Sequence, residues 1–171
     1  MLQLISVAMV VYSYFLIQTN LPNLPQRIPT HFNAAGVADG WGSPDTLWIL
    51  LGVQALTCAV FLIVPYVGQR YPGAIHVGTR RLGDFSPAQR LWMLPMLNDM
   101  AAYLCIGMNL FFVVMLRRII QAAKQPIPHL DAFWPMALLL AGTIGIILYY
   151  MVKFRCAAQG EDGGDQDRRI G

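Results

Sequence analysis

The residues best able to carry out chemistry in this sequence lie in one short stretch, IPTHFNAAGVADGWGS, at residues 28–43. The stretch combines an imidazole, an amide, a carboxylate and two aromatic rings. Imidazoles and carboxylates bind cations or protons, while amides and aromatic rings recognise peptides and small ligands. The stretch therefore predicts a ligand-binding site, formed by His31, Phe32, Asn33, Asp39 and Trp41.

The same stretch allows three other interpretations. His31, Asn33 and Asp39 can bond to backbone groups and hold the turns, and the two aromatic residues can anchor the chain at a membrane surface. A cation site would gather oxygen and imidazole ligands from His31, Asn33, Asp39, Asp45, His129 and Asp131. We assign no metal ligand and expect no cofactor, because neither a CxxC pair nor a Cys/His zinc spacing occurs.

The sequence lacks the motifs of well-known catalytic sites. It contains no P-loop, no HExxH pair and no Ser/His/Asp arrangement with supporting motifs. An enzyme is therefore the less favoured class, and no catalytic residue is assigned. Nucleic acid is an unfavoured partner, because the net charge of +3 is mild and nucleic-acid binding needs a dense basic face.

A second group of polar residues falls inside apolar runs: Gln54, Asn98, Asp99 and Asn109. Polar groups within a membrane are costly and are often functional. The simpler interpretation is that the amides, with Thr143, form hydrogen bonds between helices. The alternative is a proton or ion path that uses Asp99 and Asn109, as in an ion-coupled transporter or channel subunit.

The composition indicates which elements must position these residues. The chain is 56% hydrophobic and 12% charged, whereas soluble proteins contain about 25% charged residues. A helix crosses a bilayer with about 20 apolar residues, and four runs approach this length, at residues 1–17, 47–66, 96–116 and 133–152. The predicted fold is an all-α integral membrane protein, a four-helix transmembrane bundle over residues 1–153. The polar, Gly-rich residues 154–171 are expected to form a disordered tail.

Basic residues outside the runs predict the orientation. Eight lie between the second and third runs and after the fourth, against four in the other two loops. Since basic residues favour the cytoplasmic side, both termini are expected in the cytoplasm of a bacterial inner-membrane protein, with residues 28–43 outside. The first run lacks a basic n-region and an A-x-A site, so we expect a retained span and not a signal peptide.

Turn-forming residues predict how the loops are built. Residues 18–29 contain several prolines, which favour a stiff extended arm, and Asp39-Gly40 predicts a turn with a short hairpin. Ser43, before Pro44, is the expected N-cap of the second helix. Ser86, before Pro87, predicts a helix that runs straight into the third span.

Glycines and cysteines complete these local expectations. The glycines and the proline of residues 68–83 predict an irregular loop. Gly142 and Gly145 are expected to allow close helix packing. The chain has three cysteines, too few for a disulfide framework, so Cys58, Cys105 and Cys156 are expected to be free thiols.

The stretch LPNLPQRIPTHFNAAGVADGWGS also resembles the signature of a bacterial membrane domain of unknown function. The pattern L-P-x-x-I-P-x-H-F-x-x-x-G-x-x-D-x-W-G-S is met by Leu24, Pro25, Ile28, Pro29, His31, Phe32, Gly36, Asp39, Trp41, Gly42 and Ser43. That domain also forms the N-terminal part of Sdp-type toxin-immunity proteins, and the resemblance covers roughly residues 1–120. It implies a helical membrane bundle, with a family pattern of Asn where His76 stands here.

These observations together predict a non-enzymatic membrane module, immunity-like or ligand-sensing. It would bind an extracytoplasmic peptide or small ligand through residues 28–43. The lipid bilayer is its constant partner, and a second copy of the chain is a further one to consider, because small helical membrane proteins with Gly-rich spans often associate.

Overall fold

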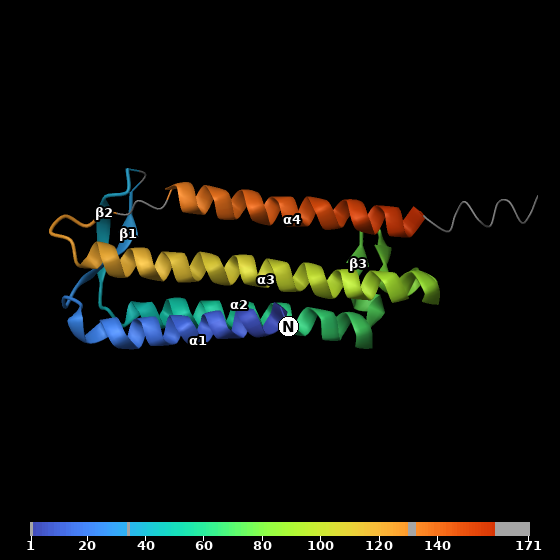
Figure 1. Cartoon of the computed structure of the whole chain (residues 1–171), viewed down its shortest axis with the longest axis horizontal. Helices are drawn as coiled ribbons and strands as arrows, with labels where there is room; N and C mark the ends of the chain where they lie inside the picture. Colours follow the sequence, from blue (N-terminus) through green and yellow to red (C-terminus); the bar gives the residue numbers. More distant parts are fainter. Residues whose placement is uncertain (1, 34, 130–132, 160–171) are drawn as a thin grey trace, which may run out of the picture.

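The computed structural model describes residues 2–33, 35–129 and 133–159. Four long helices run side by side: α1 (Leu2–Asn20), α2 (Thr46–Arg70), α3 (Pro87–Ala123) and α4 (Phe133–Gln159) (Figure 1). Each is long and apolar enough to cross a membrane. The described part of the chain is therefore mostly helical, as expected, with the helices of a multi-pass membrane protein.

The third helix, α3, organises the bundle. It packs against each of the other three helices, whereas α4 packs mainly against α3. The start of α3 is the one that the sequence predicts: Ser86 Oγ accepts a hydrogen bond from Gln89 N, and the Gln89 side chain accepts one from Ser86 N. This reciprocal capping satisfies two backbone donors at the helix start, and the helix then continues through the third apolar run.

The second helix, α2, begins two residues later than predicted. Its first residue is Thr46, and Asp45 is the N-cap. The Ser43 hydroxyl accepts a hydrogen bond from Asp45 N at 3.2 Å, and the Ser43 carbonyl accepts one from Thr46 N at 3.0 Å. Ser43 therefore closes a turn that precedes the helix, which is why it does not cap the helix itself.

Each end of the bundle carries an antiparallel hairpin. Strands β1 (Ile28–Phe32) and β2 (Ala38–Gly42) pair at one end, and the short strands β3 (His76–Val77) and β4 (Arg80–Arg81) pair at the other (Figure 1). Single 3₁₀ turns, η1 (Leu21–Asn23), η2 (Pro72–Ala74) and η3 (Leu82–Asp84), link these hairpins to the helices.

Both loops are more regular than the sequence suggests. The expected extended arm after the first run starts only after η1, because α1 continues to Asn20. The irregular loop expected over residues 68–83 is wrong: α2 continues to Arg70 through Pro65 and Gly68, and the β3–β4 hairpin follows. Gly78, with φ of 65°, provides the left-handed residue that the tight turn of this hairpin requires.

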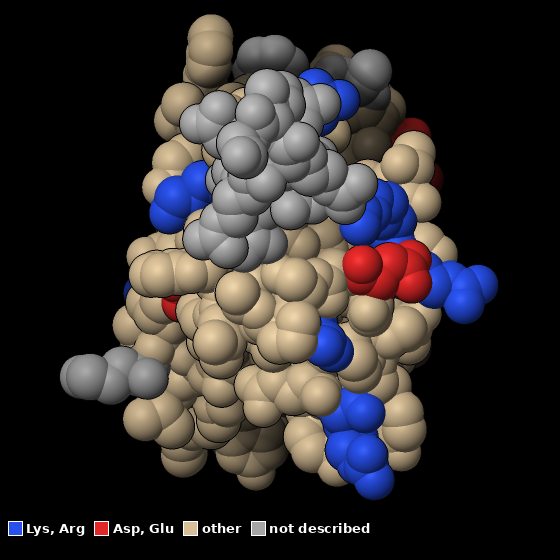
Figure 2. Space-filling model, turned by 90° about the vertical axis from the view of Figure 1, so that its right-hand side faces the viewer, with Lys and Arg blue, Asp and Glu red and all other residues tan. Residues whose placement is uncertain are grey.

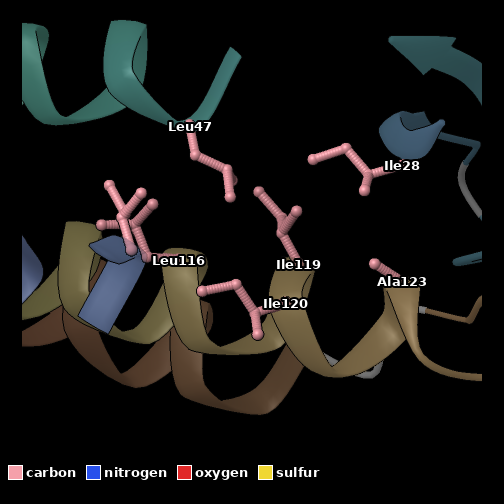
Figure 3. Packing of buried hydrophobic residues seen from close by; sticks show 7 residues of the cluster. Ile28, Leu47, Leu116, Ile119, Ile120 and Ala123 are labelled. Carbon is pink, nitrogen blue, oxygen red and sulfur yellow. The ribbon is translucent and has the colours of Figure 1, made fainter. Parts of the chain in front are cut away.

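Buried apolar side chains gather near the two hairpins. One cluster joins Ile17 of α1, Ile28 of β1 and Leu47 of α2 to the end of α3, at Leu116, Ile119, Ile120 and Ala123 (Figure 3). We call it the mounting cluster. A second cluster, at the β3–β4 end, includes Leu82, Phe85, Met93 and Leu97, with Tyr150 and Phe154 of α4. The hairpins are thus packed onto the bundle ends.

The fourth helix departs from two expectations. A Cβ atom added to Gly142 or Gly145 would meet no described atom within 4 Å, so these glycines do not serve close packing within the chain. The helix also continues to Gln159, so residues 154–159 of the expected disordered tail are helical. Residues 160–171 of that tail lie outside the described residues.

Candidate functional site

The β1–β2 hairpin contains the five residues that the sequence singles out. Pro29 pairs with Trp41, His31 with Gly40, and Phe32 with Ala38, and the register shifts on both sides of His31. Successive side chains of a strand point to opposite faces, so Asp39 and Trp41 lie on the same face of β2, and both are exposed. The irregular register brings His31 to this pair.

His31 and Asp39 form a contact between side chains. The His31 Nδ1 atom lies 2.5 Å from Asp39 Oδ1, and the two side chains are 73% and 45% exposed. A pair this exposed contributes only about 0–1 kcal/mol to folding, because water screens it. The pair therefore does little for stability, and its hydrogen-bonding groups are presented to the surroundings.

Asn33 has a structural role in the hairpin. Its side-chain oxygen accepts hydrogen bonds from the backbone nitrogens of Ala35 and Val37, each at 3.0 Å. Such bonds hold a turn without help from neighbouring strands. The turn-holding interpretation is therefore confirmed for Asn33, which closes the tip of the hairpin.

The chain that follows α3 also fixes the tip. Ala38 N donates to Pro128 O at 3.3 Å, and Val37 forms an antiparallel bridge with His129. The ring nitrogen Nε2 of His129 lies 3.0 Å from Ala35 O. His129 thus shares the hairpin's end of the molecule, as the sequence predicts, but it contacts the tip and not the His31–Asp39 pair.

The cation site is not assembled in the described part of the chain. No three His, Cys, Asp or Glu side chains come together there in a way that could hold a metal ion. The Asp45 carboxylate accepts a hydrogen bond from Ser43 Oγ at 2.9 Å. Asp131, the sixth candidate ligand, lies outside the described residues.

The two aromatic residues of the hairpin differ in environment. Phe32 is half-buried and packs against the mounting cluster. Trp41 is 46% exposed, so much of its ring is open to a ligand or to lipid. We refer to His31, Asp39 and Trp41 together as the hairpin surface.

The close approach of β1 to β2 explains why position 40 is a glycine. A Cβ atom at Gly40 would lie 2.8 Å from the His31 Cβ atom, which is closer than packed carbon atoms tolerate. We expect Gly40→Ala to move His31 away from Asp39 and to destabilise the hairpin by about 1–3 kcal/mol, as overpacking does. Chemical shifts of the His31 ring and thermal unfolding would measure both effects.

A matched control exists for this substitution. Gly52 lies within α2, and a Cβ atom there meets no described atom within 4 Å. Gly52→Ala should therefore leave the His31 ring shifts unchanged and the stability equal or slightly higher, because alanine favours a helix. Equal effects of the two substitutions would contradict the tight approach at Gly40.

Polar residues inside the helices form separate contacts. Gln54 Nε2 of α2 donates to Asn109 Oδ1 of α3 at 3.0 Å, and both side chains are buried. Gln3 of α1 donates to Asn98 Oδ1 at 3.1 Å. Gln3 was not among the predicted residues, although its polar side chain interrupts the first apolar run and is the signal that could have found it.

Asp99 lies on another side of α3. It lines an open groove of about 590 Å³ between α3 and α4, with Tyr149 and Lys153 among its neighbours. Asn109 is not part of this groove, because it faces Gln54 and also donates to Cys105 O at 2.9 Å. Asp99 and Asn109 thus have different neighbours: Asp99 lines the groove between α3 and α4, whereas Asn109 bonds to Gln54 of α2.

Thiol groups occur beside this buried amide pair. The Sγ atoms of Cys105 and Cys58 lie 3.7 Å apart, and Asn109 Nδ2 lies 3.4 Å from Cys105 Sγ. All three cysteines of the chain are free thiols, as predicted, and Cys156 is exposed. The buried pair adds polarizable packing between α2 and α3.

Comparison with known proteins gives a match over part of the chain. No curated protein and no solved structure matches the chain. The match is to a family model, and it takes in most of α1, the whole β1–β2 hairpin and the first part of α2. It includes every residue of the hairpin surface and stops before α3. Residues 4–55 of this chain, which contain the candidate site, therefore match a domain of unknown function (DUF1648).

Proposed function

We propose that the protein is a non-enzymatic membrane module that binds a peptide or small ligand on the hairpin surface, outside the cytoplasm. The observation that carries this proposal is the exposure of His31, Asp39 and Trp41 together on a firmly held hairpin. Charged or polar groups beside an exposed aromatic ring are typical of binding surfaces, where tryptophan often provides much of the affinity.

The rigid attachment of the hairpin supports a binding role. Ile28 and Pro29 at its base are fully buried, and the segment around His129 bonds to its tip. A surface that is already ordered loses little conformational freedom when a ligand binds. The exposed pair is therefore preorganised for recognition.

The expected orientation and the resemblance to immunity proteins narrow the ligand class. The excess of basic residues between the second and third apolar runs and after the fourth favours an extracytoplasmic hairpin. Immunity proteins protect a cell from a toxin peptide, so a membrane-active peptide is the first ligand to test. The hairpin contacts the ends of three helices through the mounting cluster. Ligand binding can therefore affect the bundle only while that cluster stays packed.

Substitution of Trp41 tests this proposal. The full chain in lipid nanodiscs would be titrated with a panel of synthetic membrane-active peptides, and binding would be followed by a label on the peptide. We expect at least one peptide to bind. Trp41→Ala should then weaken its binding about 30-fold, which corresponds to about 2 kcal/mol for a central aromatic contact.

Trp134 provides the matched control. It lies in the first turn of α4, near the same end of the bundle, and it is 70% exposed. Trp134→Ala should leave peptide binding unchanged if affinity comes from the hairpin surface. Equal losses for the two variants, or no binding by any peptide of the panel, would contradict the proposal.

A further inference from the structure

An apolar groove runs along one side of the seam between α3 and α4. One cavity of about 680 Å³ includes Phe111 of α3 and Leu140 of α4 in its lining, and a second, of about 370 Å³, includes Leu104 and Ile147. The second cavity also includes Leu97 and Phe154. Residues seven apart lie on the same face of a helix, so the two cavities follow one another on one side of the seam.

The groove is suited in length and polarity to an acyl chain. From Leu97 to Phe111 the helix rises by about 21 Å, which exceeds half of a bilayer hydrocarbon core, about 15 Å. The Thr143 hydroxyl, which also lines the groove, donates to Leu139 O of its own helix at 2.8 Å. Because this hydroxyl is bonded within α4, the part of the groove that α3 and α4 line presents an apolar surface.

Two side chains with nitrogen donors stand at one end of the groove. His76 of β3 and Arg155 of α4 both line the second cavity, and both are exposed. Neither side chain has a hydrogen-bond or ion-pair partner among residues 2–33, 35–129 and 133–159. Two nitrogen donors therefore face one cavity with no acceptor from the described chain.

The surrounding surface is mainly basic. Basic side chains are spread over this end of the molecule in Figure 2, which views the β3–β4 end of the bundle. In the described part of the chain, this end includes Arg70, Arg80, Arg81, Arg90, Lys153 and Arg155. The nearby Asp84 carboxylate accepts a hydrogen bond from Arg81 N at 3.0 Å, so it is engaged within the hairpin.

We infer that this groove is a binding site for an anionic phospholipid. The phosphate accepts from His76 and Arg155, and one acyl chain lies along α3 and α4 toward Phe111. Basic pockets between transmembrane helices recognise anionic headgroups in this manner. The headgroup end of this site lies opposite the hairpin surface, and no residue of the hairpin surface lines either cavity, so the inference does not rest on the proposed function.

The charge of the site distinguishes this occupant from a second copy of the chain. A helix of a second copy would cover the apolar part of the groove but would leave His76 and Arg155 without an acceptor. A free anion would satisfy these two donors but would leave the apolar lining empty. Only a molecule with both an anionic head and a long apolar tail matches the whole groove.

Native mass spectrometry of the full chain, released from detergent, tests this inference. The probes are phosphatidylglycerol and phosphatidylcholine with identical acyl chains. We expect tighter binding of phosphatidylglycerol. Arg155→Gln should weaken that binding about fivefold, the effect of about 1 kcal/mol for one arginine near a lipid phosphate, and His76→Gln should weaken it in the same direction.

Two control substitutions separate the site from general effects. Arg70→Gln removes the same charge at the same end of the bundle, but Arg70 does not line the groove. Its Cζ atom instead lies 5.4 Å from the centroid of the Tyr71 ring. It should leave phosphatidylglycerol binding unchanged. Gly107→Leu fills the groove and should weaken binding of both lipids, whereas Gly52→Leu, on the open side of α2, should not.

Three results would overturn the inference. Equal effects of Arg155→Gln and Arg70→Gln would show that only the overall charge attracts the lipid. Displacement of phosphatidylglycerol by glycerol 3-phosphate at millimolar concentration would indicate a site for soluble anions. A dimer that is lost on Gly107→Leu substitution, without any change in lipid binding, would indicate that a second copy covers the groove.

Discussion

Ile28→Ala is expected to release the β1–β2 hairpin from the bundle while the four helices stay folded. The Ile28 side chain is fully buried in the mounting cluster, where it faces Leu47 and Ile119 (Figure 3). Removing three carbon atoms from such a site leaves a cavity and costs about 2–5 kcal/mol. This cost exceeds the stabilisation of about 0–1 kcal/mol that the exposed His31–Asp39 pair contributes to folding.

Hydrogen exchange over residues 28–42 measures this release directly. In the Ile28→Ala variant, exchange in the hairpin should rise by orders of magnitude, while the middle of α3 keeps its protection, because local openings depend on local packing. Thr30→Ala is the matched control, since Thr30 lies in the same strand and is exposed. If Ile28→Ala exchanged no faster than Thr30→Ala, the mounting cluster would not hold the hairpin.

Asn109→Leu is expected to destabilise the contact between α2 and α3 by about 1–3 kcal/mol, the cost of an unsatisfied buried polar group. Asn109 is 1% exposed, and its side-chain oxygen is the acceptor for Gln54 Nε2 at 3.0 Å. The Gln54 Oε1 atom has no hydrogen-bond partner in the described structure. Removing Asn109 would therefore leave the whole Gln54 amide unsatisfied in an apolar interior.

A double substitution shows whether this loss comes from the pair. Hydrogen bonds between transmembrane helices average only about 0.6 kcal/mol, so the penalty comes mainly from the partner left alone. Gln54→Leu combined with Asn109→Leu should thus be more stable than Asn109→Leu alone. Unfolding in increasing mole fractions of denaturing detergent would give the four free energies of the cycle. Additive losses in the double variant would contradict the coupling.

The predictions from the sequence succeeded where one local signal decides the structure. Apolar runs predicted the four helices, because backbone groups in an apolar setting must bond within a helix. Ser86 predicted the start of α3, because its cap depends on residues three positions apart. The short hairpin was also predicted, because its two strands are neighbours in the chain. The predicted turn is wrong, however: Asp39 and Gly40 lie within β2, and the chain turns between Asn33 and Val37.

Other features depend on contacts that the sequence does not contain locally. Ser43 resembles a helix cap, yet it closes a turn of its own before α2. The His31–Asp39 contact arises from a shifted register, and the position of His129 depends on where α3 ends. Gly142 and Gly145 have the spacing of packing residues, but both line the open groove between α3 and α4, and a Cβ atom at either position would meet no described atom within 4 Å.

Side-specific thiol labelling is the most direct test of a ligand-binding hairpin outside the cytoplasm. In a chain with Cys58, Cys105 and Cys156 replaced, Ala35→Cys places one thiol at the exposed hairpin tip, and Thr79→Cys places one in the opposite hairpin as the control. We expect an impermeant maleimide to label position 35 in intact cells and position 79 only after lysis. Labelling of position 79 in intact cells, with position 35 protected until lysis, would contradict the proposed function.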